Sequence, residues 1–169
     1  MRTLILGGAR SGKSRHAEKL ANESNQAVVY IATGWAGDEE MSARIAHHRE
    51  RRPAHWLTVE APCALANAMQ LHANPNRFVI VDCLTLWLSN VLEKGEECFQ
   101  RERNSLIDCL PTLSGQICLV GNEVGLGIVP SNPLARRFVD EAGRLHQDLA
   151  RICERVMWIT AGLPHTLKG

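Results

Sequence analysis

Residues Gly7 to Ser14 read GGARSGKS, which fits the pattern G-x-x-x-x-G-K-[ST]. An apolar run at 3–6 (TLIL) precedes this stretch, and a helical pattern at 13–23 follows it. Glycines let such a loop turn its backbone N–H groups toward phosphate oxygens, and the positive end of the helix dipole adds to the attraction. The sequence therefore predicts a P-loop that binds a nucleoside triphosphate, and a small phosphotransferase is the function it favours.

The general mechanism of P-loops predicts a role for individual side chains. Lys13 is predicted to reach the β- and γ-phosphates, and Ser14 to hold Mg²⁺. Asp82 ends a buried strand pattern (FVIVD) and is the second predicted magnesium ligand, directly or through water; as an alternative, it caps the next helix. The predicted nucleotide-binding residues of the loop are Gly7, Gly8, Ala9, Arg10, Ser11, Gly12, Lys13 and Ser14.

Strand-like and helix-like segments alternate along the rest of the chain. We expect strands at 3–6, 27–32, 55–59, 78–82, 116–120 and 155–160. We expect helices at 13–23, 38–52, 63–72, 84–92, 96–110 and 133–154. Most of the strands are continuously apolar, which is typical of a parallel sheet covered on both faces. The sequence therefore predicts an α/β fold in a single domain, 1–169.

Composition excludes several other classes of protein. The 19 basic and 18 acidic residues give a net charge of +1, so no nucleic-acid footprint is expected. No apolar stretch is long enough to span a membrane, and Met1 leads directly into the first strand pattern, so no signal peptide is expected. The six cysteines show no C-x-x-C spacing. We therefore expect a cytoplasmic protein with reduced thiols that act as small buried apolar groups.

A basic segment within 38–52 is the second candidate for function. On a helix, Arg44, His47 and Arg51 share one face. Neutral imidazole attacks phosphorus without prior deprotonation, so His47 is a candidate nucleophile. A solvated basic helix is the other interpretation, and spacing alone favours it.

The region 121–131 (GNEVGLGIVPS) has the composition of a loop and is a candidate substrate lid. Glu123 follows the strand pattern at 116–120. It is a candidate base, a candidate second metal ligand, or the first residue of a surface loop, and sequence reasoning leaves these readings open.

Five motifs occur in an order that resembles one known family. They are GGARSGKS with Arg15 and Ala17-Glu18, YIAT (30–33), ARIAHHRERRPAHW (43–56), VDCLTLWLSN (81–90) and NEVGLGIVP (122–130). Together they resemble the bifunctional adenosylcobinamide kinase / adenosylcobinamide-phosphate guanylyltransferase of cobalamin assembly. The resemblance spans almost the whole chain.

The resemblance implies two reactions and a fold. First, ATP or GTP phosphorylates the aminopropanol hydroxyl of adenosylcobinamide. Then GTP transfers GMP to adenosylcobinamide phosphate through a GMP–histidine intermediate, and the motif places that histidine at His47. The family is similar to RecA-like P-loop folds and tends to form homotrimers.

The resemblance also implies further nucleotide contacts. By position these are Ala32, Thr33, Gly34, Arg49, Glu50, Arg51, Arg52, Glu60 and Asp82, in addition to the P-loop. The chain departs from the family pattern in two places. Gly121 stands where the pattern has Thr, and Glu50-Arg51 replaces Asp-Gly ahead of Arg52.

Two alternative functions come from the same P-loop. One is a monofunctional small-molecule kinase without guanylyl transfer. The other is a regulatory GTPase, but such proteins read guanine with an N-K-x-D motif, and this chain has no Asn-Lys pair.

Overall fold

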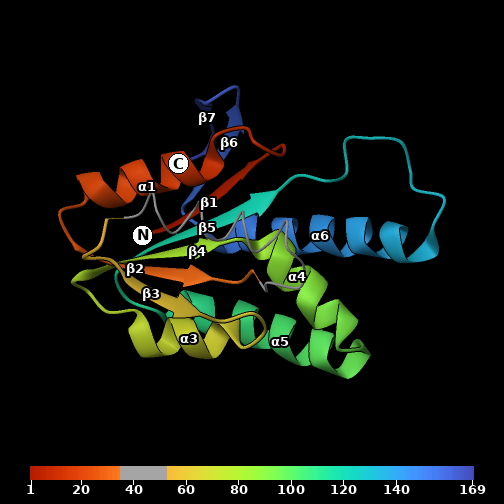
Figure 1. The fold of residues 1–169 in the computed structure, drawn as a ribbon, viewed down its shortest axis with the longest axis horizontal. Coiled ribbons are helices and arrows are strands. Elements are labelled where there is room, and N and C mark those ends of the chain that lie inside the picture. The colour runs from red at the N-terminus through yellow and green to blue at the C-terminus, as the bar shows by residue number, and fades with distance from the viewer. Residues whose placement is uncertain (35–52) are drawn as a thin grey trace.

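The computed structural model describes residues 1–34 and 53–169, and these form one seven-stranded sheet (Figure 1). Its order is β3-β2-β4-β5-β1-β6-β7, with β7 antiparallel to β6 and every other neighbouring pair parallel. The strands are β1 (Arg2–Gly7), β2 (Ala27–Ala32), β3 (Leu57–Glu60), β4 (Arg77–Asp82), β5 (Gln116–Asn122), β6 (Arg155–Thr160) and β7 (Leu163–Lys168).

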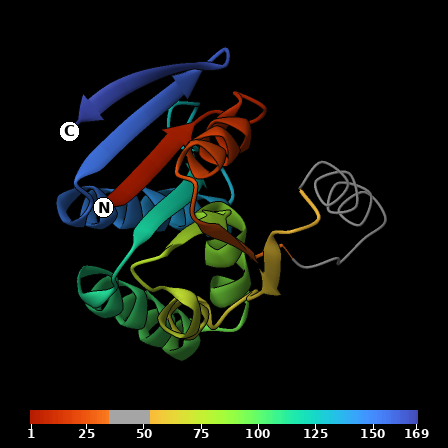
Figure 2. The ribbon, with the colours of Figure 1, turned by 90° about the vertical axis from the view of Figure 1, so that its left-hand side faces the viewer.

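Helices cover both faces of this sheet, although unequally among the described residues. They are α1 (Lys13–Glu23), α3 (Leu65–His72), α4 (Leu84–Glu93), α5 (Glu96–Cys109), a 3₁₀ turn η1 (Leu110–Thr112) and α6 (Pro133–Ile152). Figures 1 and 2 show α1 on one side of the sheet and α3, α5 and α6 on the other. The predicted mostly parallel α/β architecture with helices on both faces is therefore confirmed.

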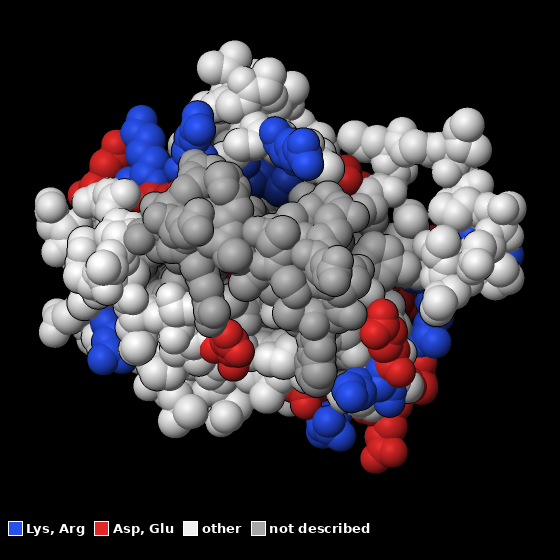
Figure 3. All heavy atoms as spheres, viewed as in Figure 1, with Lys and Arg blue, Asp and Glu red and all other residues white. Residues whose placement is uncertain are grey.

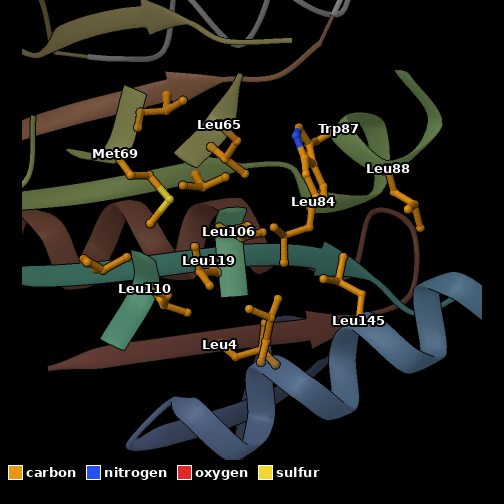
Figure 4. Packing of buried hydrophobic residues seen from close by; sticks show 14 of the residues in the cluster. Leu4, Leu65, Met69, Leu84, Trp87, Leu88, Leu106, Leu110, Leu119 and Leu145 are labelled. Atoms are coloured by element: carbon orange, nitrogen blue, oxygen red, sulfur yellow. The ribbon is translucent and has the colours of Figure 1, made fainter. Parts of the chain in front are cut away.

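The continuously apolar strands form the centre of the molecule, with one apolar cluster on each face of the sheet. The larger cluster joins the sheet to the four helices α3, α4, α5 and α6, and Figure 4 shows Leu4, Leu84, Trp87 and Leu145 within it. The smaller cluster lies under α1, where Ala17 and Ala21 let the helix approach the strands closely. Burial of this kind contributes roughly 25 cal/mol per Å² of apolar surface.

The predicted elements differ from the observed ones mainly at their ends. The strand expected at 55–59 lies at Leu57–Glu60, and the helix expected at 133–154 ends at Ile152 because Cys153 is extended. The helix expected at 38–52 lies outside the described residues. Strand β7 was not predicted, since all six of its residues are exposed and it carries no apolar alternation.

Candidate active site

The carboxyl edge of the sheet brings several of the predicted site residues in the described part of the chain into one row. Glu60 is the register partner of Ala32, and Ala32 is the partner of Asp82. Strand β5 lies between β4 and β1, and its Asn122 is the partner of Gly7, where the P-loop begins. Ligands of open α/β sheets bind at this edge, so the topology places the predicted contacts together.

The P-loop depends on glycine at two positions of unusual backbone geometry. Gly7 has φ 152°, and a Cβ there would lie 2.4 Å from the carbonyl oxygen of Ile159. Gly12 has φ 101°, and a Cβ there would lie 3.1 Å from the Cα of Gly162. The turn between β6 and β7 also supports the loop, because the N–H of Gly162 donates to the carbonyl of Ser11 at 2.8 Å.

Gly7→Ala is expected to lower the free energy of unfolding by about 3 kcal/mol or more, because it combines a strained φ with a backbone clash. Gly8→Ala is the matched control, since a Cβ at Gly8 meets nothing within 4 Å. Urea denaturation of both variants without nucleotide checks this. A Gly7→Ala variant as stable as Gly8→Ala would contradict the geometry.

Lys13 lies buried at the start of α1, inside the loop that it is predicted to serve. Its ammonium donates to the carbonyl of Gly8 at 2.5 Å and lies 3.4 Å from the hydroxyl oxygen of Ser11. Burial lowers the pKa of Lys13, and the nearby Cys83 and Asp82 side chains oppose this shift. Lys13, at the start of α1, and Asp82, at the end of β4, are therefore close enough for the carboxylate to influence the ammonium group.

Asp82 is held at the end of β4 by an aromatic neighbour. The hydroxyl of Tyr30, on β2, donates to the Asp82 carboxylate. Tyr30 itself is buried and stacks on Trp56, with ring centroids 6.5 Å apart. Sequence reasoning missed this bond, because it joins residues of two strands whose adjacency only the sheet order reveals.

Thr33 directly follows β2 and is fully buried, with its polar atoms bonded within the protein. Its hydroxyl donates to the carbonyl of Cys83 at 2.7 Å and accepts from the Cys83 N–H at 2.8 Å. Its carbonyl accepts from the Asn90 side chain at 2.9 Å. Thr33 thus fixes the chain between β2 and α4. Its predicted contact with a nucleotide stays a prediction.

Glu60 ends β3 at the rim of a cavity of about 380 Å³. Ala61, Pro62 and Asn67 also line this cavity, which lies between the end of β3 and α3. A cavity of this size accommodates part of a ligand. The predicted contact of Glu60 therefore has space beside it.

Five predicted site residues lie outside the described residues. They are His47, Arg49, Glu50, Arg51 and Arg52. The candidate nucleophile and the arginines beside it therefore remain predictions from the sequence.

Glu123 and His146 form a pair that sequence reasoning did not find. The N–H of Glu123 donates to the carbonyl of Gly7 at 3.0 Å, which places Glu123 against the start of the P-loop. His146, on α6, has its Nδ1 3.9 Å from Oε2 of Glu123. A signal existed in the sequence, since Ala142, His146 and Leu149 share the buried face of α6 at helical spacing.

The same histidine lies close to Gly121, the position at which the chain departs from the family pattern. A Cβ there would lie 3.1 Å from Nε2 of His146 and 3.3 Å from Cδ2 of Leu6. A threonine at this position would need the imidazole to move. Glycine at 121 therefore avoids a close contact with the His146 imidazole.

Surface charge and thiols agree only in part with the expectations. On the face seen in Figure 3, basic and acidic side chains of the described residues lie mixed, without a broad basic stripe. All six cysteines are free thiols.

Four of these thiols are buried, as the sequence predicts, but Cys63 and Cys98 are half-buried. Within 1–34 and 53–169, no helix is both long and apolar enough to cross a bilayer.

Solved structures resemble this chain in fold at low sequence identity. The crystal structure of the RadB recombinase matches with a TM-score of 0.55 at 16% identity, over 93% of this chain and 73% of that one. An ATPase of the type III secretion system of pathogenic bacteria matches with a TM-score of 0.57 at 14% identity, over 98% of this chain and 57% of that one. The fold and the loop together define a mostly parallel α/β fold of the P-loop class, similar to the fold of these two structures.

Sequence relatives identify the family within that class. The family model for cobinamide kinase / cobinamide phosphate guanyltransferase matches residues 3–167. The bifunctional adenosylcobalamin biosynthesis protein CobP of Pseudomonas aeruginosa is 59% identical over 100% of this chain and 98% of its own length. CobU of Escherichia coli is 42% identical over 99% of this chain and all of its own.

The chain belongs to the cobinamide kinase / cobinamide phosphate guanyltransferase family. It is accordingly a bifunctional enzyme, a kinase and a guanylyltransferase of cobalamin biosynthesis. The comparisons favour this reading over the monofunctional kinase.

Proposed function

We propose that one triphosphate cradle, the loop from Gly7 to Ser14, serves both reactions of this chain. In the kinase step, ATP or GTP lies with its β- and γ-phosphates against the loop, and Lys13 neutralises charge that develops on the transferred group. The aminopropanol hydroxyl of adenosylcobinamide attacks the γ-phosphorus. An O–P bond forms, the bond to the bridging oxygen breaks, and the nucleoside diphosphate leaves.

In the guanylyl step, an imidazole nitrogen of His47 attacks the α-phosphorus of GTP and pyrophosphate leaves. An oxygen of adenosylcobinamide phosphate then attacks that phosphorus and breaks the N–P bond, which gives adenosylcobinamide-GDP. The covalent link divides one difficult displacement into two easier ones. Arg49, Arg51 and Arg52 follow His47 closely in the sequence and would stabilise charge on the transferred group.

One observation carries the proposal: the carboxyl edge of the sheet brings the P-loop, Asp82 and Glu60 into register in a chain whose family has both activities. The test follows the two activities separately on the native chain. Adenosylcobinamide with γ-labelled ATP or GTP is expected to yield labelled adenosylcobinamide phosphate, and α-labelled GTP alone is expected to label the protein. Native protein that gives neither result overturns the proposal.

The donors at the loop suit Mg²⁺, the metal that supplies charge neutralisation at the phosphates when bound. The Ser14 hydroxyl and the Asp82 carboxylate are hard oxygen donors of the kind that Mg²⁺ prefers. Among the described residues no cluster of three or more His, Cys, Asp or Glu side chains forms a complete metal cage. Two protein oxygens, with phosphate oxygens and water as the remaining ligands, fit the usual pattern for this metal.

Tyr30→Phe is expected to weaken magnesium-dependent nucleotide binding roughly fivefold, because one hydrogen bond to Asp82 is worth about 1 kcal/mol. Phenylalanine keeps the ring that stacks on Trp56. Titration of a fluorescent GTP analogue with and without Mg²⁺ checks this. Equal magnesium dependence of binding in the variant and the native chain would contradict a role of the Tyr30 hydroxyl in magnesium-dependent nucleotide binding.

We further propose that the chain is a cytoplasmic, single-domain protein that assembles into a homotrimer. The free thiols and the single sheet support the first two statements. The segment 123–132 projects beyond the sheet (Figure 1), and its Leu126, Ile128 and Val129 side chains are exposed, which favours contact with another surface. Light scattering in solution tests the trimer, and a monomer would contradict it. Closure of this segment as a substrate lid stays a prediction.

A further inference from the structure

Glu123 directly follows strand β5 and is not among the nucleotide contacts described above. The strand lies between β1, which leads into the P-loop, and β4, which ends at Asp82. The hydrogen bond from the Glu123 N–H to the Gly7 carbonyl fixes its backbone there. In the kinase step proposed above the γ-phosphate lies against this loop, so the Glu123 carboxylate is at the same edge of the sheet as the reacting groups.

The Glu123 carboxylate is held by a hydrogen bond at one of its oxygens, and its other oxygen lies near a histidine. Oε1 accepts from the N–H of Gly125 at 2.5 Å, and Oε2 faces the His146 imidazole at 3.9 Å. The side chain is 22% exposed, so the carboxylate is still open to a substrate. Such an arrangement orients a group without removing its capacity to accept a proton.

His146 is an unusual residue to bury at this point. It is 7% exposed, and its Nδ1 has no hydrogen-bond partner among the described residues. Burial lowers its pKa, and the Glu123 charge opposes that shift, so the ring is neutral at neutral pH. An unpaired buried nitrogen costs about 1–3 kcal/mol, which a simple apolar residue on the same helix face would avoid.

Space around the ring is reserved by Gly121. A Cβ at Gly121 would lie 3.1 Å from Nε2 of His146, so the absence of a side chain at Gly121 leaves room for the imidazole. The ring is buried, and its Nδ1 lies on the side of Glu123. A small approach of the two groups would create a hydrogen bond from Nδ1–H to Oε2.

We propose that Glu123 accepts the proton of the attacking hydroxyl in the kinase step, and that His146 is the positioning residue that orients its carboxylate. The hydroxyl oxygen forms its bond to the γ-phosphorus, the bridging P–O bond breaks with its electrons on the leaving diphosphate, and the hydroxyl proton passes to Glu123 and then to solvent. This inference rests on the proposed kinase step. It assigns no part in guanylyl transfer to either residue.

The test compares kinase turnover and protein guanylylation in the same variants. Glu123→Gln is expected to lower the kinase kcat on the order of 100-fold, with little change in the KM for nucleotide, while α-labelled GTP still labels the protein fully. Glu123→Ala is expected to regain kinase turnover when formate is added at constant ionic strength. Full kinase turnover in Glu123→Gln, recovery of that variant by raised Mg²⁺, or no response of Glu123→Ala to formate would overturn the base assignment.

His146 is tested by its own pair of variants. His146→Leu is expected to lower the kinase kcat roughly tenfold without changing the KM for nucleotide, and His146→Gln, which keeps a donor, is expected to restore most of it. Equal turnover in His146→Leu and the native chain, or no difference between the two variants, would overturn the positioning role. A native chain without kinase turnover would instead refute the proposed function itself, so the two failures are distinguishable.

Discussion

His47→Ala is expected to abolish guanylyl transfer while the kinase step continues. Loss of a covalent nucleophile is expected to lower transfer by at least the order of 10³-fold, since no second group takes over its bond to phosphorus. The measurement incubates the protein with α-labelled GTP and tests for a label that is lost in acid and kept in alkali. Kinase turnover with adenosylcobinamide is measured on the same preparation.

The adjacent histidine provides the control for this experiment. His48→Ala is expected to keep the label, because the family resemblance places the nucleophile at the first histidine of the pair, His47. A label that survives in His47→Ala would contradict the assignment of His47. If the label survives in His47→Ala and is lost in His48→Ala, the nucleophile is His48.

Lys13→Ala is expected to lower kinase kcat/KM on the order of 10²–10³-fold, because the loop loses the cation that stabilises the transferred phosphoryl group. If one cradle serves both reactions, the rate of guanylylation by α-labelled GTP falls as well. His47→Ala, in contrast, affects only one activity. The two variants therefore distinguish a residue that both reactions need, Lys13, from one that only guanylyl transfer needs, His47.

Stability distinguishes this loss from unfolding. Burial lowers the pKa of Lys13, so the protein already bears a cost for the buried ammonium, and alanine relieves that cost. Lys13→Ala is thus expected to unfold at the same urea concentration as the native chain or a higher one. Lys19→Ala, at an exposed residue of α1 that pairs with Glu23, is the matched control and is expected to keep both activities. Full kinase turnover in Lys13→Ala would contradict the role of Lys13.

Much of the architecture was predictable, because local signals specify it. The apolar runs that became β1, β2, β4, β5 and β6 are buried on both faces of the sheet. Their continuous apolar pattern therefore predicted their burial correctly. β7 lacked such a signal, since its stability comes from pairing with β6 at the sheet edge. The order of the strands was not predictable either, because it arises from packing between distant segments.

The site divides in the same way. The P-loop could be predicted because its chemistry requires a short local pattern, and the structure adds why Gly7 admits no side chain. The partners of Asp82 and Glu123 could not be predicted, because Tyr30 and His146 reach them from other strands and helices. The prediction of His47 as nucleophile rests on the motif resemblance, since its spacing alone favoured a solvated helix.

One experiment tests most directly the central claim that this chain carries out both attacks, one on the γ-phosphorus and one on the α-phosphorus of GTP. The native chain is incubated with adenosylcobinamide, Mg²⁺ and GTP that is labelled distinguishably at the α- and γ-phosphorus atoms, and the product is isolated. The account predicts adenosylcobinamide-GDP that carries both labels in equal amounts, the γ-label from the kinase step and the α-label from guanylyl transfer. A product that carries the γ-label alone, however long the incubation, would contradict it.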